Sequence, residues 1–213
     1  MIELSSKTRV DKRFKLNELF KLTAADKTIK YSAKNVLSVT LTNVLSKDTL
    51  NLRQTGTVKE IYVFVIELSS DTIPAPFIIA LDKAINLHTI FVLRYDGKEI
   101  LYGCYKQIAE SAVKLGKYYS TDWQDENIAV NLPISVSCID DVYTAIIDLL
   151  IPITARPEEP TGDFVVRYDT ILKLDKEIEK LQRLVDNEKQ SKKRFELNER
   201  LKELKRQRKN LNA

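Results

Sequence analysis

The C-terminal part of the chain contains neither glycine nor proline from Asp163 onward. Because these two residues most often interrupt helices, their absence allows one long helical stretch. The apolar residues there repeat at intervals of three and four, first as Ile171, Leu174, Ile178, Leu181 and Val185, then as Leu197, Leu201, Leu204 and Leu211. This spacing predicts a long helical or coiled-coil tail over residues 164–213.

The two halves of this repeat are out of phase with each other. A polar stretch at residues 186–194 separates them. Such a phase change fits either one long, kinked helix or a hairpin of two helices that turns near residues 187–191. We favour the hairpin, whose halves fold against each other or against a partner, although the lack of a helix breaker keeps the continuous helix open.

The tail also carries the excess positive charge. Residues 192–213 hold nine basic and three acidic side chains, a net charge of +6, whereas the whole chain is +4 and the remainder therefore −2. Such a helix can contact phosphates independently of sequence, or it can present a solvated face whose charges pair with nearby acids. The candidate residues for binding nucleic acid or a partner are Lys192, Lys193, Arg194, Arg200, Lys202, Lys205, Arg206, Arg208 and Lys209.

Residues 1–155 alternate between strand and helix patterns. We expect strands at residues 36–44, 57–68, 88–95 and 99–106, a pairing segment at 48–52, and helices at about 14–21, 24–34, 73–85 and 137–151. Asp96 and Gly97 form a strong hairpin signal. The pattern predicts an α/β or α+β domain with a mixed β-sheet flanked by helices. A proline-containing linker at residues 156–163 joins it to the tail.

Residues typical of common active sites are scarce. The five glycines are too dispersed for a phosphate-binding loop, and a single histidine, His88, cannot form a two-histidine zinc site. Cys104 and Cys138 lie far apart and are expected to be buried, reduced thiols. We therefore expect no metal and no cofactor, name no catalytic residue, and lean toward a protein that is not an enzyme.

A divergent metal-dependent nuclease is the enzymatic alternative. Such an enzyme needs an acid at one strand end and a Glu-x-Lys or Asp-x-Lys pair on the next. The Glu-x-Lys of this chain lies in the tail, at Glu203 and Lys205, and Asp96-Gly97-Lys98 is better explained as a turn. The acids and lysine that could line a pocket in the globular domain are Glu60, Asp82 and Lys106.

A group of aromatic residues has two interpretations. Tyr118, Tyr119 and Trp123 lie near Lys114 and Lys117, so they could stack the bases of a single strand. Packing onto the core is the alternative that we favour.

No apolar run approaches the roughly 18 residues that span a bilayer, and the first residues lack a signal-peptide pattern. We expect a cytoplasmic protein without a membrane partner.

Several segments carry a family resemblance. They are residues 10–15, 45–52, 59–64, 81–85, 90–93, 118–123, 141–143, 188–190 and 196–198. In this order and spacing they resemble, along nearly the whole chain, a bacterial family called domain of unknown function 4391. The resemblance implies genes that neighbour helicases and DNA methyltransferases in restriction or phage-defence clusters. It implies no established activity, so no catalytic residue can be assigned from it.

These observations lead to one functional hypothesis and one further alternative. We hypothesise a non-enzymatic accessory or adaptor subunit of a DNA-processing assembly, whose basic tail contacts DNA or a partner such as a helicase or DNA methyltransferase. Besides the nuclease, the alternative is a coiled-coil protein that forms a homo-oligomer through its C-terminal helices and binds no nucleic acid.

Overall fold

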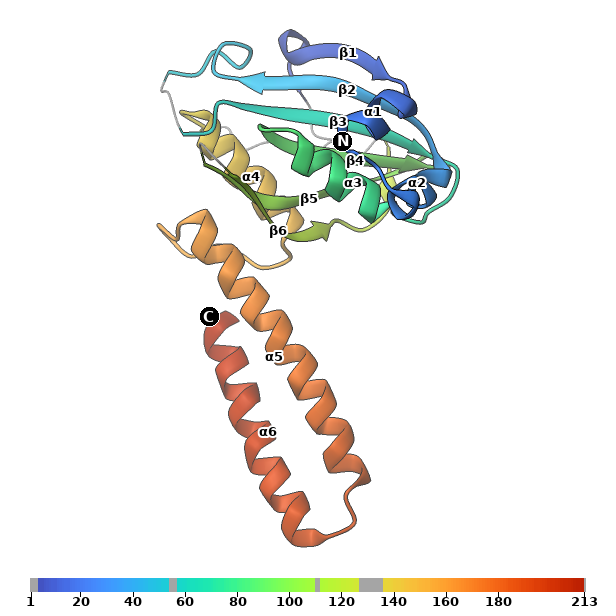
Figure 1. The fold of residues 1–213 in the computed structure, drawn as a ribbon. Coiled ribbons are helices and arrows are strands. Elements are labelled where there is room, and N and C mark those ends of the chain that lie inside the picture. Colours follow the sequence, from blue (N-terminus) through green and yellow to red (C-terminus); the bar gives the residue numbers. More distant parts are fainter. Residues whose placement is uncertain (1–3, 54–56, 110–111, 127–135, 213) are drawn as a thin grey trace. The chain divides into compact units, whose positions relative to one another are not determined.

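The computed structural model describes residues 4–53, 57–109, 112–126 and 136–212 (Figure 1). Residues 1–3 and 213, the outermost of the predicted domain and tail, lie outside this set. The chain forms two compact units, Met1–Pro152 and Ile153–Ala213. The first contains a mixed β-sheet flanked by helices, as predicted, and the second contains two long helices.

One sheet organises the first unit. Its strands are β1 (Arg9–Phe14), β2 (Val36–Ser46), β3 (Glu60–Leu68), β4 (His88–Tyr95), β5 (Lys98–Ala109), β6 (Ala112–Ser120) and β7 (Gln124–Asp125). Neighbouring strands follow the chain order from β1 to β6, and β7 pairs with β5. Strands β3 and β4 are parallel, and the other pairs are antiparallel.

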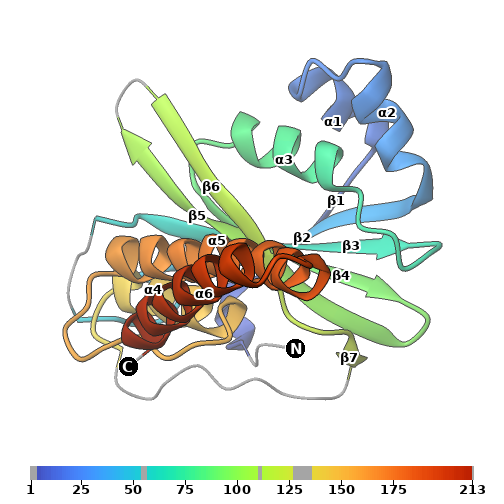
Figure 2. The same cartoon turned by 90° about the horizontal axis from the view of Figure 1, so that it is seen from below.

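Helices cover both faces of this sheet. They are α1 (Leu16–Leu22), α2 (Lys27–Ser32), α3 (Ala75–Ala84) and α4 (Ile139–Leu150), with short 3-10 turns η1 (Ser6–Thr8) and η2 (Ala33–Asn35). Figure 2 shows α1, α2 and α3 on one face and α4 on the other. The alternation of side chains along β-strands explains this arrangement, because successive residues point to opposite faces. Helix α3 connects the parallel strands β3 and β4.

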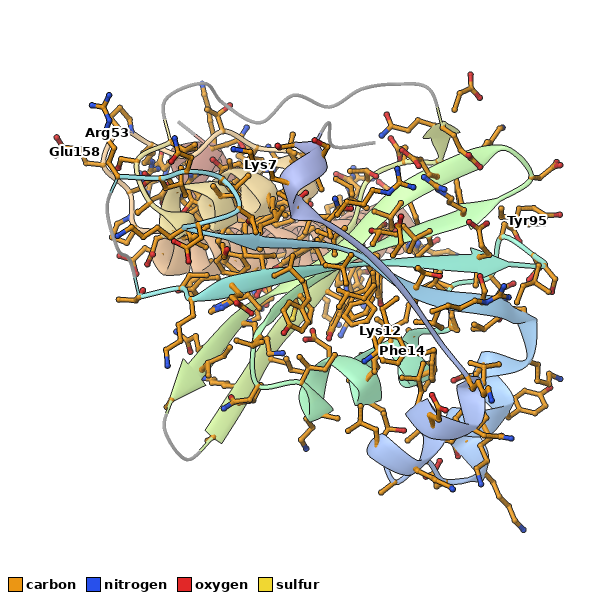
Figure 3. The ribbon with its side chains drawn as sticks, turned by 90° about the horizontal axis from the view of Figure 1, so that it is seen from above. Lys7, Lys12, Phe14, Arg53, Tyr95 and Glu158 are labelled. Atoms are coloured by element: carbon orange, nitrogen blue, oxygen red, sulfur yellow. The ribbon has the colours of Figure 1, made fainter. Side chains whose placement is uncertain are left out.

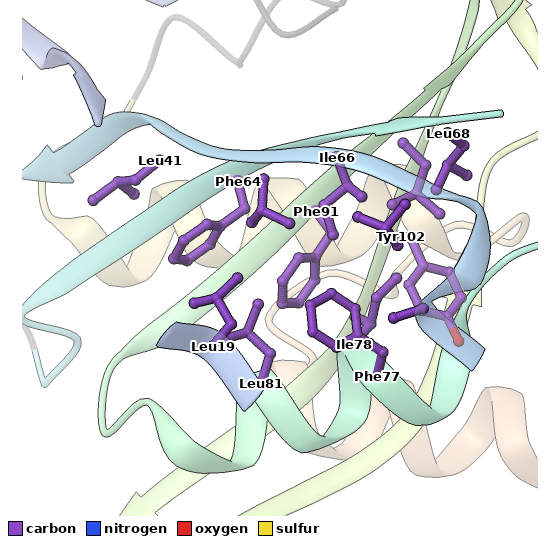
Figure 4. Close-up of a cluster of buried hydrophobic side chains, with 14 of the residues drawn as sticks. Leu19, Leu41, Phe64, Ile66, Leu68, Phe77, Ile78, Leu81, Phe91 and Tyr102 are labelled. Carbon is purple, nitrogen blue, oxygen red and sulfur yellow. The ribbon is translucent and has the colours of Figure 1, made fainter. Parts of the chain in front are cut away.

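A hydrophobic cluster fills the space between α3 and the sheet (Figure 4). Phe77, Ile78 and Leu81 of α3 are fully buried. They pack in one cluster with Phe64 of β3 and Phe91 of β4, whose rings stack with centroids 5.8 Å apart. Fully burying each such side chain contributes about 1.5–3 kcal/mol, so this cluster is a main source of stability for the unit.

The local expectations hold where apolar periodicity is clear and are wrong where it is weak. The hairpin turn at Asp96 and Gly97 is confirmed, with φ of 48° and 71° at the two residues. The predicted pairing segment at 48–52 is instead a turn, in which the Leu52 amide donates to the Lys47 carbonyl. Strand β1 was not predicted, because its residues are mostly exposed and show no alternation of apolar and polar side chains. Strand β6 lies outside the strands predicted from the sequence.

The close approach of β5 and β6 at Gly116 leads to a stability prediction. A Cβ at this position would lie 2.8 Å from the carbonyl oxygen of Tyr105, a backbone atom that cannot rotate away. We therefore expect Gly116→Ala to lower the free energy of unfolding by about 1–3 kcal/mol, the usual cost of overpacking, measured by urea denaturation.

Gly103→Ala is the matched control on β5. Its Cβ would meet only the terminal methyl groups of Ile90 and Leu150, at 2.7 and 3.3 Å, which can move. A loss at Gly103 as large as that at Gly116 would contradict this explanation.

Candidate functional site

The sheet divides between β4 and β5 (Figure 2). Their pairing extends only from Phe91 opposite Tyr102 to Tyr95 opposite Lys98. Before Phe91, β4 pairs with β3, and after Tyr102, β5 pairs with β6. Polar groups between the diverging strands therefore need other partners. We call this region the fork, and a buried polar cluster occupies it.

Lys106 of β5 lies at the centre of this cluster. Its side chain is only 1% exposed. The ammonium nitrogen Nζ donates to Oδ1 of Asp82 and to the backbone carbonyls of Asp82 and Ile85, each at 2.7 Å. Asp82 and Ile85 lie at the C-terminal end of α3, where the helix dipole favours a cation. All three N–H groups of the ammonium thus have an acceptor.

The Asp82 carboxylate is equally well satisfied. Its Oδ1 also accepts a hydrogen bond from the Thr89 hydroxyl of β4, and its Oδ2 accepts one from the Tyr118 hydroxyl of β6. The Cys104 thiol lies 3.6 Å from the same Oδ2. A buried ion pair stabilises a fold only when its remaining hydrogen-bonding groups are also satisfied, and this one meets that condition.

Burial keeps the Cys104 thiol and the Tyr118 hydroxyl, which both neighbour Asp82, protonated. Burial, followed by the negative charge of Asp82, raises the pKa of the Cys104 thiol to about 12. The same two causes, in the same order, raise the pKa of Tyr118. Both groups therefore act as neutral hydrogen-bond donors at neutral pH, and Cys104 does not present the thiolate that a nucleophile requires.

Helix α4 closes the fork from the opposite face of the sheet. The Tyr143 hydroxyl accepts from the Lys106 amide at 2.7 Å and donates to the Cys104 carbonyl at 3.1 Å. It thereby replaces a neighbouring strand for this part of β5. The His88 ring packs against Tyr143, with centroids 4.4 Å apart. Burial, and then the charge of Lys106, lowers the pKa of His88, so its neutral form is favoured.

The structure brings together two of the three residues predicted to line a pocket. Asp82 and Lys106 form the buried ion pair, whereas Glu60 lies at the start of β3. The pair uses its hydrogen-bonding capacity to fasten α3, β4, β5 and β6 to one another. This arrangement fits a structural anchor, and we do not assign it a reaction. Sequence reasoning missed Thr89, whose hydroxyl has no local signal.

The aromatic residues near Lys114 and Lys117 belong to the core. Tyr118 stacks on Tyr102 with ring centroids 5.1 Å apart. Trp123 packs edge-on against Tyr95 at 6.5 Å. These contacts support the packing interpretation of the aromatic group over the stacking of bases.

Within the described ranges, no three histidine, cysteine, aspartate or glutamate residues lie close enough to hold a metal ion together. None of the helices in those ranges combines the length and the apolar composition needed to cross a bilayer.

The second unit is a helical hairpin. Helices α5 (Thr161–Asn187) and α6 (Ser191–Asn212) are joined by residues 188–190. Leu181 and Val185 of α5 and Leu201 of α6 are buried in their contact, with Ile178, Leu197 and Leu204 packed around them. Of the two alternatives for the tail, the structure contains the hairpin, and its turn lies within the predicted residues. Coiled-coil packing in the strict sense stays a prediction.

Polar contacts fix the alignment of the two helices. Arg208 pairs with Asp175 at 3.0 Å, and Lys205 donates to Gln182 at 3.2 Å. At the end of the hairpin opposite its turn, Arg167 donates to the Leu211 and Thr154 carbonyls. It also forms a bidentate ion pair with Glu159. Arg156 donates to the Asn210 and Leu211 carbonyls as well.

We call Arg156, Glu159 and Arg167 the clasp. Its arginines donate hydrogen bonds to the last carbonyls of α6, which receive none from N–H groups of the helix itself. The positive charge of the arginines also suits the negative end of the helix dipole. The clasp therefore holds the end of α6 beside the start of α5.

The predicted binding residues lie on α6, and most are exposed. Lys202, Arg206 and Arg208 form ion pairs with acids of the hairpin, and Arg208 is the one of the nine that is only partly exposed. The helical spacing places Arg194, Lys202, Lys205 and Lys209 along one side of α6, and Glu196, Glu199 and Glu203 along another. We call the four basic residues the basic stripe.

The comparisons with known proteins give one match. A family described as "Domain of unknown function (DUF4391)" matches residues 2–207 of the 213-residue chain. This confirms the resemblance predicted from the sequence. No curated protein and no solved structure matches the chain significantly.

The buried ion pair gives a prediction that tests its role as an anchor. Lys106→Met leaves the Asp82 carboxylate buried without its counter-ion, so we expect the free energy of unfolding to fall by about 3–5 kcal/mol. Adding Asp82→Asn removes the uncompensated charge, and the double variant should be more stable than Lys106→Met alone. Urea denaturation of the three proteins measures both effects.

The control is Lys98→Met, an exposed lysine on the same strand. It should change stability by no more than about 0.5 kcal/mol. A double variant less stable than Lys106→Met would contradict the ion-pair explanation.

The clasp gives a prediction for pH dependence. Hydrogen bonds from Arg167 lower the pKa of Glu159 from 4.5 to about 2. Because the folded-state pKa is lowered, ionised Glu159 stabilises the hairpin above pH 4.5, and this contribution disappears as the pH falls toward 2. Helix content followed by circular dichroism during thermal unfolding should show Glu159→Gln destabilising the protein at neutral pH.

The difference between the wild type and Glu159→Gln should shrink as the pH falls through this range. Glu158→Gln is the adjacent control and should lack the effect. A difference between wild type and Glu159→Gln that stays constant down to pH 2 would exclude the ion pair as its cause.

Proposed function

The chain belongs to this family, and we propose that it is a cytoplasmic, non-enzymatic accessory subunit of a DNA-processing assembly that contacts the DNA backbone through the basic stripe. One observation carries the proposal. Arg194, Lys202, Lys205 and Lys209 share one side of a helix. Two features hold this helix in place, its apolar contact with α5 and the clasp. A fixed array of cations loses less conformational freedom on binding than a disordered basic tail.

The dimensions of the stripe suit a phosphate backbone. Arg194 and Lys209 lie fifteen residues apart, about 22 Å along the axis at the helical rise of 1.5 Å per residue. Double-stranded DNA carries one charge for about every 1.7 Å of its axis. The stripe can therefore reach several phosphates. Contacts of this kind bind without reading sequence, so target choice would belong to a partner.

The wider assembly is inferred from the family resemblance. A helicase or DNA methyltransferase in a restriction or phage-defence system is the partner that we propose on that basis. The carboxylates of α6 and the exposed residues of α5 give such a partner other parts of the hairpin to bind.

Self-association through the C-terminal helices is the second candidate. Val166, Leu184 and Phe195 are large apolar side chains of the hairpin, and they are 65%, 50% and 65% exposed. Exposed apolar side chains can mark a protein interface when they lie together. Multi-angle light scattering of the full chain, with Leu184→Gln and Phe195→Gln as variants, tests whether they set an oligomeric state.

Neutralising the basic stripe tests the DNA contact. The full chain with Arg194, Lys202, Lys205 and Lys209 changed to glutamine should bind a labelled DNA duplex at least tenfold more weakly, measured by fluorescence anisotropy. The slope of log K against log salt should also fall by about 3–4, because each lost phosphate contact removes about 0.9.

The control removes the same number of charges from α5. Lys173, Lys176, Lys180 and Arg183 are exposed, and their change to glutamine should leave DNA binding nearly intact. Circular dichroism verifies that both variants keep their helices. Equal losses in the two variants would mean that only total charge matters, and the assignment to α6 would then be wrong.

A further inference from the structure

A second concentration of positive charge lies at the start of the chain. Residues 1–35 hold nine basic and four acidic side chains, a net charge of +5. Because residues 192–213 carry +6 and the whole chain +4, residues 36–191 carry −7. The net charge of −2 over residues 1–191 therefore conceals the positive charge of residues 1–35. The elements that carry it are η1, β1, α1, α2 and η2.

The orientation of α2 follows from its buried residues. Ile29 packs against the hydrophobic cluster of the first unit, and Ala33 in η2 is 4% exposed. Asp26 accepts a hydrogen bond from the Ile29 amide at 2.8 Å and caps the helix. With Ile29 and Ala33 inward, the outward side presents three lysines and one tyrosine, all exposed, beside the exposed Thr28. The lysines and the tyrosine are Lys27, Lys30, Lys34 and Tyr31.

Tyr31 is unusual among these residues because it is a large aromatic side chain in water. It is 68% exposed, the highest value among the large hydrophobic side chains exposed within the described ranges. The Lys34 ammonium lies 3.6 Å from the centroid of its ring. A cation so placed covers one face of the ring and leaves the other face as the stacking surface.

The neighbouring elements extend the positive charge. Lys12 and Phe14 lie on β1 (Figure 3), and the Lys12 ammonium is 5.2 Å from the Phe14 ring centroid. Lys15 and Lys21 lie just before and within α1, and both are exposed. Helices α1 and α2 lie side by side in all three views (Figures 1–3). The exposed tyrosine therefore lies within a broader basic surface.

We propose that the outward side of α2 and η2 binds single-stranded nucleic acid, with Lys27, Lys30 and Lys34 on phosphates and Tyr31 stacked on a base. Lysines beside an exposed aromatic ring are the usual elements of sequence-tolerant single-strand binding. A duplex keeps its bases stacked inside, where the Tyr31 ring cannot reach them. This site lies in the first unit and does not depend on the basic stripe of α6.

An anionic membrane is a weaker match for the same charges. Helices that lie in a membrane interface need a long apolar face opposite their basic face. Helix α2 has six residues, and its apolar Ile29 is packed into the protein. The charges and the single ring are therefore better suited to a nucleic-acid strand.

The first test measures binding of the full chain to labelled oligothymidylate by fluorescence anisotropy. Tyr31→Ala should weaken binding about tenfold, the typical effect of losing one base–aromatic stack, and Tyr31→Phe should retain most of the affinity. Changing Lys27, Lys30 and Lys34 to glutamine should lower the slope of log K against log salt by about 2, since each single-strand phosphate contact contributes about 0.7.

Two comparisons separate this site from the basic stripe and from bulk charge. Changing Lys173, Lys176 and Lys180 of α5 to glutamine removes the same charge and should leave single-strand binding unchanged. Tyr31→Ala should bind a DNA duplex as the wild type does, whereas the stripe variant should lose duplex binding if the proposed function is correct. The two proposals can therefore fail separately.

Wild-type affinity for oligothymidylate in Tyr31→Ala, or an equal loss in the α5 control, would overturn the proposal. Vesicles containing phosphatidylserine distinguish the membrane alternative. If the three lysine changes abolish vesicle binding but leave oligothymidylate binding intact, the surface is a membrane contact instead. Because the altered side chains are exposed, each variant should keep the thermal unfolding curve of the wild type.

Discussion

The ion pair between Asp82 and Lys106 is the interaction on which the arrangement of the first unit depends. It joins α3 to β5 where β5 has already left β4, so backbone pairing cannot hold the two strands together there. Its charges tolerate burial because Thr89, Tyr118 and the carbonyls at the end of α3 complete their hydrogen bonds. Tyr143 supplies the equivalent support from α4. The fork is thus a polar joint inside an apolar core.

This joint also limits what the first unit does chemically. A lysine with three acceptors and a carboxylate with several donors have no hydrogen-bonding capacity left for a substrate. The functional surfaces that we propose lie elsewhere, on exposed helices whose basic residues protrude while their apolar residues are used for packing. In both α2 and α6 the folding requirement determines which residues face inward, and the charges occupy the remaining sides.

Sequence reasoning succeeded where one short segment contains its own signal. The apolar centre of β3, the stripe of α3 and the phase change before α6 each identify an element or a turn. It was less complete where the signal depends on distant residues. Asp82 and Lys106 lie 24 positions apart and were named together as pocket candidates, but the ion pair between them depends on strand register. Glu60, which was named with them, lies at the start of a strand instead. Edge strand β1 was missed because solvent on both sides removes alternation.

The antiparallel course of α5 and α6 has an electrostatic consequence. Their peptide dipoles point in opposite directions and largely cancel, so at a distance the field of the hairpin comes from its side chains alone. Side-chain charges in water are screened within about 10 Å at 0.1 M salt. The hairpin therefore senses a polyanion only once the two surfaces are nearly in contact, which favours a role in holding DNA that another component has already brought close.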